Sequence, residues 1–202
     1  MKKFFMIFAA AALMVTAFSA CNKDPKPGEE EEPAAAVNLW AEALGDYTLE
    51  WYYNPNWEHG DGITDPAKQP TVGQKDGVWT VTVPDLTTGD WQAQLWIHPG
   101  KELKLDNTKR YRFKISIQSS TDGAIYFKLY HKGVDGEFCC HLDPRPTLNA
   151  GQEYVFIYED ITVLSANLDL LIDFAGHAAS TSFTIKDIVL EEILDEIVIA
   201  VE

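Results

Sequence analysis

The sequence predicts an all-β protein, specifically an antiparallel β-sandwich of the jelly-roll type. No long segment repeats apolar residues at helical spacing, whereas many short segments alternate apolar and polar residues. Gly, Pro, Asn and Asp separate these segments, as turns between strands require. Strands at this spacing are typical of sandwiches and jelly rolls, and a chain of this length can bury a sizeable core.

The alternating segments are the predicted strands of the sandwich. The last of them changes phase between Ile185 and Ile188, so it either contains a bulge near Asp187 or runs between two buried faces. The apolar tail 193–202 fits a further edge strand or a short helix equally well. In chain order, the predicted strands are 77–85, 90–99, 110–118, 124–133, 153–161, 168–176 and 182–192.

Residues 1–20 are predicted to be a lipoprotein signal peptide. A basic start precedes the apolar run 4–18, which is too short and too early for an ordinary membrane span. The small residues Ser19 and Ala20 directly precede Cys21, as at a lipoprotein cleavage site. We therefore expect Cys21 to carry lipid as the first mature residue. The alternative is ordinary cleavage that leaves a free thiol.

A flexible tether is predicted for 21–36, because Pro, Gly and a run of four Glu cannot build a core. The segment resembles that of Bacteroidetes-type lipoproteins, in which an acidic patch after the cysteine accompanies display on the outer face of the cell. The resemblance implies an outer-membrane protein that faces the exterior and touches the membrane through its lipid alone. The remainder, 37–202, suits one domain.

The net charge of −15 excludes some classes of partner. A strongly acidic surface repels nucleic acid and anionic lipid, so we expect neither to be bound.

Cysteine is scarce, since Cys21 is joined only by the neighbours Cys139 and Cys140. Neighbours on a strand point to opposite faces, so a disulfide between them needs a distorted backbone. We expect one buried and one exposed thiol. The spacing matches no metal-binding or thioredoxin-like cysteine motif.

The polar face of the predicted strand 90–99 is unusual. It carries Gln92, Gln94, Trp96 and His98, where a strand that faces only water would more typically carry Lys, Glu, Thr or Ser. An indole and two amides on one face suggest a ligand.

A second predicted strand, 124–133, adds Tyr126, Lys128 and Tyr130 on its polar face. Together the two faces would form a groove with the chemistry that sugars need. The C–H faces of a pyranose ring lie flat on aromatic rings, while amide and charged groups pair with its hydroxyls. A solvated outer face with incidental aromatic residues is the alternative.

All six tryptophans lie between residues 40 and 96, and their environments are expected to differ. Trp79 and Trp91 share the apolar phase of their strands and are predicted to be core residues. Trp57 lies in the loop-like stretch 51–62, which contains four aromatic residues. Exposed loop aromatics face a ligand or fold back as a lid.

The order of motifs resembles that of the family 4/9 carbohydrate-binding modules, especially versions in glycan-utilising Bacteroidetes surface lipoproteins. The match covers roughly 38–192. Its motifs are NLW at 38–40, Trp-Gln-x-Gln at 91–94, the lysine-containing strand 124–133, Asp-Phe near a glycine at 173–176 and Ile-x-Asp-Ile at 185–188.

The resemblance implies a jelly roll whose concave sheet binds one glycan chain without catalysis. It also implies a structural calcium with Asp187 as the matching carboxylate, although Lys186 replaces an acidic residue often found before it. No other cofactor is expected. By position, the implied sheet residues are Gln92, Gln94, Trp96, Tyr126, Lys128 and Asp173, with Trp57, Tyr52 and Tyr53 in a loop that walls the sheet.

The expected function is therefore non-catalytic binding of a neutral polysaccharide or oligosaccharide at the cell surface, alongside outer-membrane glycan-uptake proteins. One alternative is a structural or protein-interaction lipoprotein, such as an adhesin or a transporter assembly partner. Another is a jelly-roll polysaccharide lyase or hydrolase, in which His98 and Tyr130 would act as base and acid. No compact carboxylate signature of a glycosidase is present.

Overall fold

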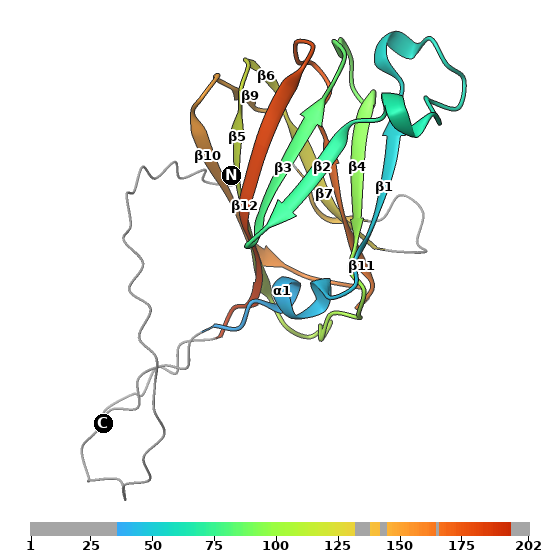
Figure 1. The fold of residues 1–202 in the computed structure, drawn as a ribbon. Helices are drawn as coiled ribbons and strands as arrows, with labels where there is room; N and C mark the ends of the chain where they lie inside the picture. Colours follow the sequence, from blue (N-terminus) through green and yellow to red (C-terminus); the bar gives the residue numbers. More distant parts are fainter. Residues whose placement is uncertain (1–35, 132–137, 142–144, 165, 195–202) are drawn as a thin grey trace, which may run out of the picture. The chain divides into compact units, whose positions relative to one another are not determined.

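The computed structural model describes residues 36–131, 138–141, 145–164 and 166–194 (Figure 1). Most of the elements are short strands. In chain order they are α1 (Leu39–Leu44), β1 (Thr48–Tyr53), η1 (Pro55–Trp57), η2 (Pro66–Lys68), β2 (Thr71–Lys75), β3 (Val78–Val83), β4 (Ala93–His98), β5 (Tyr111–Ser119), β6 (Gly123–Ala124), β7 (Tyr126–His131), β8 (Phe138–His141), β9 (Thr147–Leu148), β10 (Glu153–Ile161), β11 (Leu168–Asp173) and β12 (Thr181–Glu192).

Two five-stranded antiparallel sheets make up the domain. The first sheet has the strand order β1-β4-β11-β7-β8, and the second has the order β10-β5-β12-β3-β2. Strands β6 and β9 pair separately as a small ribbon. The two large sheets lie against each other in Figure 1, which confirms the predicted antiparallel β-sandwich.

Aromatic side chains join the two sheets across the core. Phe127 of β7 contacts Phe113 of β5, with ring centroids 5.6 Å apart, and contacts Phe156 of β10 at 5.8 Å. Phe174, which follows β11, packs on Phe183 of β12 at 4.6 Å. Each sheet therefore turns its apolar face inward, and burial of these rings is the main stabilising contribution.

Of the four edge strands of the two large sheets, the sequence predicted β10, as 153–161, and missed β1, β2 and β8. The 51–62 stretch is a loop only from Asn54, because its first residues belong to the edge strand β1. Much of β1 is exposed, so it lacks the clean alternation of a strand with one buried face. Strands β2 and β8 are edges as well, and α1 is too short to give a helical period.

A bulge explains the phase change in β12. The register against β5 shifts between Lys186 and Val189, and Asp187 has a φ of 53°. The extra residue returns Ile188 and Leu190 to the inward face already used by Ile185. Of the two alternatives that the sequence left open, the bulge is the one that the structure contains.

A second bulge corrects the expectation for the cysteine pair. The register between β7 and β8 shifts between Leu129 and Tyr130. Cys140 is buried and Cys139 is half-buried, and both pack against the core. The alternation rule that predicted one exposed thiol fails here because a bulged strand has one residue more than its partner.

Several predictions concern residues outside those that the structure describes. They are the signal peptide, the lipidated Cys21, most of the tether and the tail from 195 onward, so they stay predictions. No helix within the described residues is long and apolar enough to span a membrane.

Asn38 fastens the start of the domain to β12. Its side-chain oxygen accepts hydrogen bonds from the backbone N–H groups of Ala41, at 3.3 Å, and Leu190, at 3.2 Å. Its amide nitrogen donates to the carbonyl of Ile188 at 3.0 Å. One side chain thus caps α1 and ties it to the second sheet.

Replacing Asn38 with Ala should lower the free energy of unfolding by about 1–3 kcal/mol, because the helix cap and two partly buried hydrogen bonds are lost together. Urea denaturation followed by tryptophan fluorescence measures the change. The exposed Asn107→Ala serves as the matched control and should shift stability by less than about 0.5 kcal/mol. Equal effects of the two variants would show that Asn38 does not fasten this end of the domain.

Candidate functional site

The outward face of the first sheet gathers aromatic and polar side chains from neighbouring strands. On β4, Ala93, Leu95 and Ile97 are buried, and the residues between them are half-buried and point outward. The antiparallel register sets outward residues of adjacent strands side by side. The resulting rows are Tyr52, Gln94, Asp173 and Tyr126, then Glu50, Trp96, Leu171 and Lys128, then Thr48, His98, Asp169 and Tyr130.

This outward face, called the binding face below, therefore brings together most of the residues that sequence alternation selected. Gln94, Trp96, Tyr126, Lys128 and Tyr130 all lie on it and are all half-buried. Each of them is therefore partly accessible from solvent.

Trp91 is a correction to the sequence analysis, because it joins the binding face and not the core. It precedes β4 in a turn and has a φ of 67°, a left-handed conformation that breaks the alternation counted from Ala93. Its ring meets Tyr126 edge to face, with centroids 5.2 Å apart. The ammonium nitrogen of Lys128 lies 5.1 Å from the centroid of the Trp91 ring.

The prediction that Gln92 lies on this face is also wrong, because the turn at Trp91 breaks the alternation there as well. It is fully buried and lies off the binding face. Its side-chain oxygen accepts hydrogen bonds from the backbone N–H groups of Thr88, at 2.6 Å, and Gly89, at 2.9 Å. Its backbone carbonyl accepts from Asn54 at 2.8 Å. Gln92 therefore holds the loop before β4 in shape and presents no group to a ligand.

Four rings on the binding face form what we call the aromatic cluster: Trp91, Trp96, Tyr126 and Tyr130. Trp96 and Tyr130 meet edge to face at 5.2 Å. Lys128 links the two halves of the cluster, because its ammonium nitrogen lies 4.8 Å from the Tyr130 ring as well as near Trp91. Cation–π contacts of this kind orient the rings and keep the cation among them.

Arg145 is a site residue that the sequence analysis missed. Its guanidinium pairs with Asp90 at 2.5 Å and with Asp173 at 2.6 Å, and its central carbon lies 5.3 Å from the Tyr126 ring. It comes from the connection after β8, between two prolines, where no periodicity marks it. Only the tertiary fold places it beside Trp91, 5.8 Å from that ring.

Asp173 lies beneath Arg145 and is fully buried, which corrects the prediction that it lines the groove. Its carboxylate accepts hydrogen bonds from the backbone N–H groups of Trp91, at 2.8 Å, and Ala175, at 3.0 Å. Burial raises the pKa of Asp173, and Arg145 and these two N–H groups oppose the rise. Burial likewise lowers the pKa of the Lys128 amine, and Asp173 opposes that change.

His98 occupies the other end of the binding face, between two carboxylates. Its Nδ1 lies 3.0 Å from the buried Asp169, and its Nε2 lies 3.5 Å from the exposed Glu50. The Trp96 ring stacks nearly parallel to the imidazole at 6.4 Å. Both ring nitrogens of His98 therefore face a carboxylate.

Trp57 lies next to Tyr52, and its role as a wall of the binding face stays a prediction. Tyr52 and Tyr53, predicted in the same loop, belong to β1, and Tyr53 is buried in the core. The Trp57 side chain is 53% exposed, and its ring centroid lies 6.5 Å from that of Tyr52. A side-chain carbon at Gly89 would lie 3.6 Å from the indole nitrogen, so the ring rests over that glycine. Asn54 shapes the loop by accepting a hydrogen bond from the backbone N–H of His59 at 3.0 Å.

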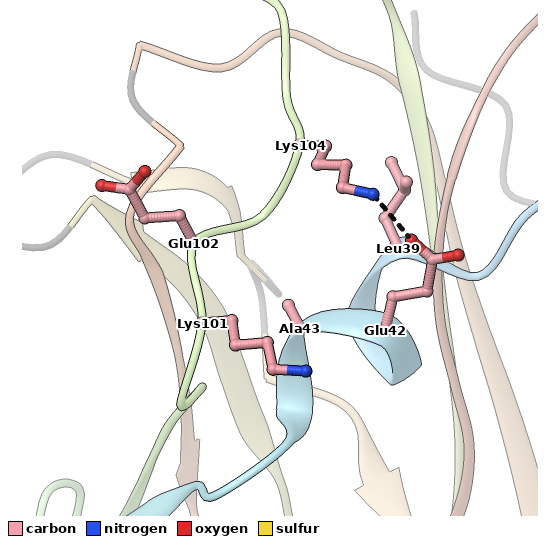
Figure 2. A pocket seen from close by; sticks show the side chains of 6 residues that line it. All are labelled: Leu39, Glu42, Ala43, Lys101, Glu102 and Lys104. Atoms are coloured by element: carbon pink, nitrogen blue, oxygen red, sulfur yellow. Dashed lines mark ion pairs between the residues drawn. The ribbon is translucent and has the colours of Figure 1, made fainter.

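A hollow of about 450 Å³ lies elsewhere, between α1 and the segment after β4 (Figure 2). Its lining is charged and mixed in sign, with Lys104 and Glu42 paired at 3.9 Å. Figure 2 shows no aromatic ring among its lining side chains, which are Leu39, Glu42, Ala43, Lys101, Glu102 and Lys104. It offers neither the stacking surface nor the buried polar groups found on the binding face.

No group of three or more His, Cys, Asp or Glu side chains in the described part of the chain could hold a metal ion. The Asp187 carboxylate accepts a hydrogen bond from the Ser116 hydroxyl at 3.0 Å. The calcium that the resemblance implies stays a prediction.

No protein-family model matches this chain, and no curated protein matches it. Solved structures do match. The first and second N-terminal cellulose-binding domains of the Cellulomonas fimi β-1,4-glucanase C are 13% and 16% identical, with TM-scores of 0.49 and 0.48. The matches cover 75% and 79% of this chain and 97% of each domain.

TmCBM61, solved in complex with β-1,4-galactotriose, is 12% identical with a TM-score of 0.47, and the match covers 76% of this chain and 94% of that one. Carbohydrate-binding modules are thus among the proteins with similar structures. Because the identities are low and the TM-scores lie below 0.5, the similarity concerns the fold alone.

Replacing Arg145 with Gln should lower the free energy of unfolding by about 3 kcal/mol at neutral pH, because the Asp173 carboxylate is left buried without its cation. The pKa of Asp173 in the folded protein then rises further above its ordinary value of 3.8. The free energy of unfolding should therefore fall more steeply as the pH rises from 3.8 to this raised pKa. Below that window the loss should be much smaller. Urea denaturation at neutral pH and at about pH 3.5 measures both effects.

Arg112→Gln is the matched control for this experiment. Arg112 pairs with Glu159 at 2.9 Å and with Glu191 at 3.0 Å on a more exposed surface. Its loss should cost less than about 1 kcal/mol. Two results would contradict the conclusion that Arg145 compensates the buried charge of Asp173. One is a loss of stability in Arg145→Gln no larger than that in Arg112→Gln, and the other is the same loss at both pH values.

Proposed function

We propose that the binding face binds a neutral polysaccharide or oligosaccharide chain and does not cleave it. The observation that supports this most directly is the aromatic cluster, whose rings are half-buried on a sheet face beside amide, carboxylate and cationic groups. A solvated outer face would not hold two indoles and two phenols in contact with one another. Sugar rings need apolar stacking surfaces and hydrogen-bonding groups at the same place.

Each part of the binding face has a role in this proposal. Trp91 and Trp96 supply surfaces on which the C–H faces of sugar rings stack. Gln94 and Lys128 donate hydrogen bonds to hydroxyl groups, and the Tyr126 ring adds apolar surface. Trp57, at the side of the face, limits the direction in which a bound chain can run.

The charge distribution favours a neutral ligand over an acidic one. Arg145 is already paired with Asp90 and Asp173, so its charge is compensated within the protein. The face also carries Glu50 and Asp169, and the whole chain has a net charge of −15. The carboxylates of Glu50 and Asp169 and the negative charge of the whole chain would repel an acidic glycan.

The carboxylates of the binding face support binding without catalysis. A glycosidase needs one carboxyl group that donates a proton and a second that acts as base or nucleophile. Here Asp90 and Asp173 contact Arg145, and Glu50 and Asp169 contact His98. Each is engaged with a basic group of the protein.

The affinity of one binding face should be modest, because an open sheet face orders a flexible chain and buries little area. We propose that the lipid on Cys21 displays many copies on the outer face of the cell, where binding to several points of one polysaccharide raises the avidity. Outer-membrane glycan-uptake proteins are the proposed recipients of the captured glycan. Both the proposed display on the cell surface and the proposed uptake proteins rest on the sequence.

Trp96→Ala and Trp91→Ala should each weaken binding at least about 30-fold, a loss of roughly 2 kcal/mol, because each removes a central stacking surface. The test is affinity electrophoresis on native gels that contain one neutral or acidic polysaccharide each. The protein is the full chain carrying Cys21→Ser, which blocks the predicted lipid attachment. The parent chain should be retarded by a neutral glycan and by no acidic one.

Tyr47→Ala is the control, because it removes a half-buried ring that contacts Trp79 at 4.9 Å, away from the binding face. It should leave retardation unchanged, and thermal melts should show all three variants folded. Parallel assays for reducing ends and for unsaturated sugars should detect no product. Product formation would replace this proposal with a hydrolase or lyase, and an absence of retardation on every gel would favour a structural role.

A further inference from the structure

The bulge in β8 creates a feature that lies outside the binding face. On β7, Leu129 is paired with Cys140 and Tyr130 with Phe138, which leaves Cys139 as the extra residue between them. A bulged residue has no partner in the ladder, and the strand bends at that point. Consecutive side chains at a bulge are released from strict alternation between the two faces.

Both cysteine side chains contact the core of the domain. Cys140 is 5% exposed and belongs to the core, and the half-buried Cys139 packs against it. The Cys139 thiol points toward the carbonyl of Leu129, with sulfur and oxygen 3.8 Å apart. Both cysteines are free thiols in this structure.

We propose that Cys139 and Cys140 form a reversible vicinal disulfide, with a small-molecule disulfide as the oxidant. The bulge supplies the distorted backbone that such a bond needs, because it releases neighbouring side chains from strict alternation at a point where both cysteines contact the core. The site takes its chemistry from these two residues alone, so it does not depend on the glycan-binding proposal.

The two thiols have different roles in the reaction. Cys139 is the more exposed, so its thiolate attacks one sulfur of the oxidant, forms a mixed disulfide and releases one thiolate. The Cys140 thiolate then attacks the sulfur of Cys139 and releases the second thiolate. Two protein thiols are oxidised to one disulfide, the oxidant is reduced to two thiols, and the two protons pass from the cysteines to the released groups.

The second step is the slow one. Burial raises the pKa of the Cys140 thiol well above its ordinary value, and the neighbouring Cys139 adds to the rise. The thiolate that must resolve the mixed disulfide is therefore scarce at neutral pH. The rate of ring closure should increase with pH through the neutral and mildly alkaline range.

The disulfide should also be easy to reduce. Adjacent Cα atoms are about 3.8 Å apart across a trans peptide, which is closer than the usual separation in disulfides of roughly 4.4–6.8 Å. The eight-membered ring is consequently strained, and strained disulfides are the labile ones in thiol exchange. This property makes the pair a reversible redox site and not a permanent staple.

Oxidised glutathione is the probe that tests this proposal, applied to the full chain carrying Cys21→Ser so that only the pair retains thiols. Alkylation followed by peptide mass analysis should find both cysteines in one unalkylated peptide that has lost two hydrogen atoms. Excess reduced glutathione should restore two alkylatable thiols. In Cys140→Ser, a glutathione adduct should persist on Cys139, because the resolving thiol is absent.

The parent chain alone can overturn the proposal, so the test stands even if a variant fails to fold. A glutathione adduct that persists on Cys139 would show that Cys140 does not resolve it. Disulfide-linked dimers, or two thiols that stay alkylatable after long exposure at mildly alkaline pH, would also contradict it. A disulfide that resists excess reduced glutathione would contradict the reversibility.

Discussion

The buried carboxylate of Asp173 organises the binding face, and the other contacts there depend on it. It is fixed at the end of β11, in the middle of the first sheet, and accepts hydrogen bonds from two backbone N–H groups while it pairs with Arg145. One of those N–H groups belongs to Trp91, so the same carboxylate sets the turn that enters β4. A single desolvated charge thereby ties a strand to two separate connections. The cost of burying that charge is offset only while all of its partners are present.

Local departures from strand alternation determine where the chemistry lies. Trp91 reaches the binding face because its backbone is left-handed, and Gln92 is turned inward by the same turn. The bulge at Asp187 has the opposite effect, because it restores the inward face of β12. At Cys139 an extra residue interrupts the alternation, and both neighbouring cysteines contact the core. In each case one residue changes the environment of those beside it.

These departures also set how much could be predicted from the sequence. Alternation over 77–85, 110–118 and 153–161 reflects strands with one buried face, so the sandwich and the outward positions of Gln94, Trp96 and Lys128 were predictable. The edge strands β1 and β2 leave most of their residues exposed or half-buried and so show no such pattern, and turn conformation is not encoded in hydrophobicity. Arg145 was out of reach for a further reason: it meets Trp91 through a loop, and only long-range packing brings the two together.

The position of α1 has a mechanical consequence. The backbone N–H groups of Gly100 and Lys101 donate to carbonyls of α1, which places this helix at the His98 end of β4. Trp91 lies before the opposite end of this strand, which is about 17 Å long. Asn38 ties the α1 end of the domain to β12, in the other sheet (Figure 1). If a molecule bound at Trp91 were pulled away from the N-terminal segment, the force would therefore act along the length of β4. It would also act across the core between the two sheets. A strand inside a sheet, such as β4, resists a lengthwise pull in shear, because many hydrogen bonds share the force.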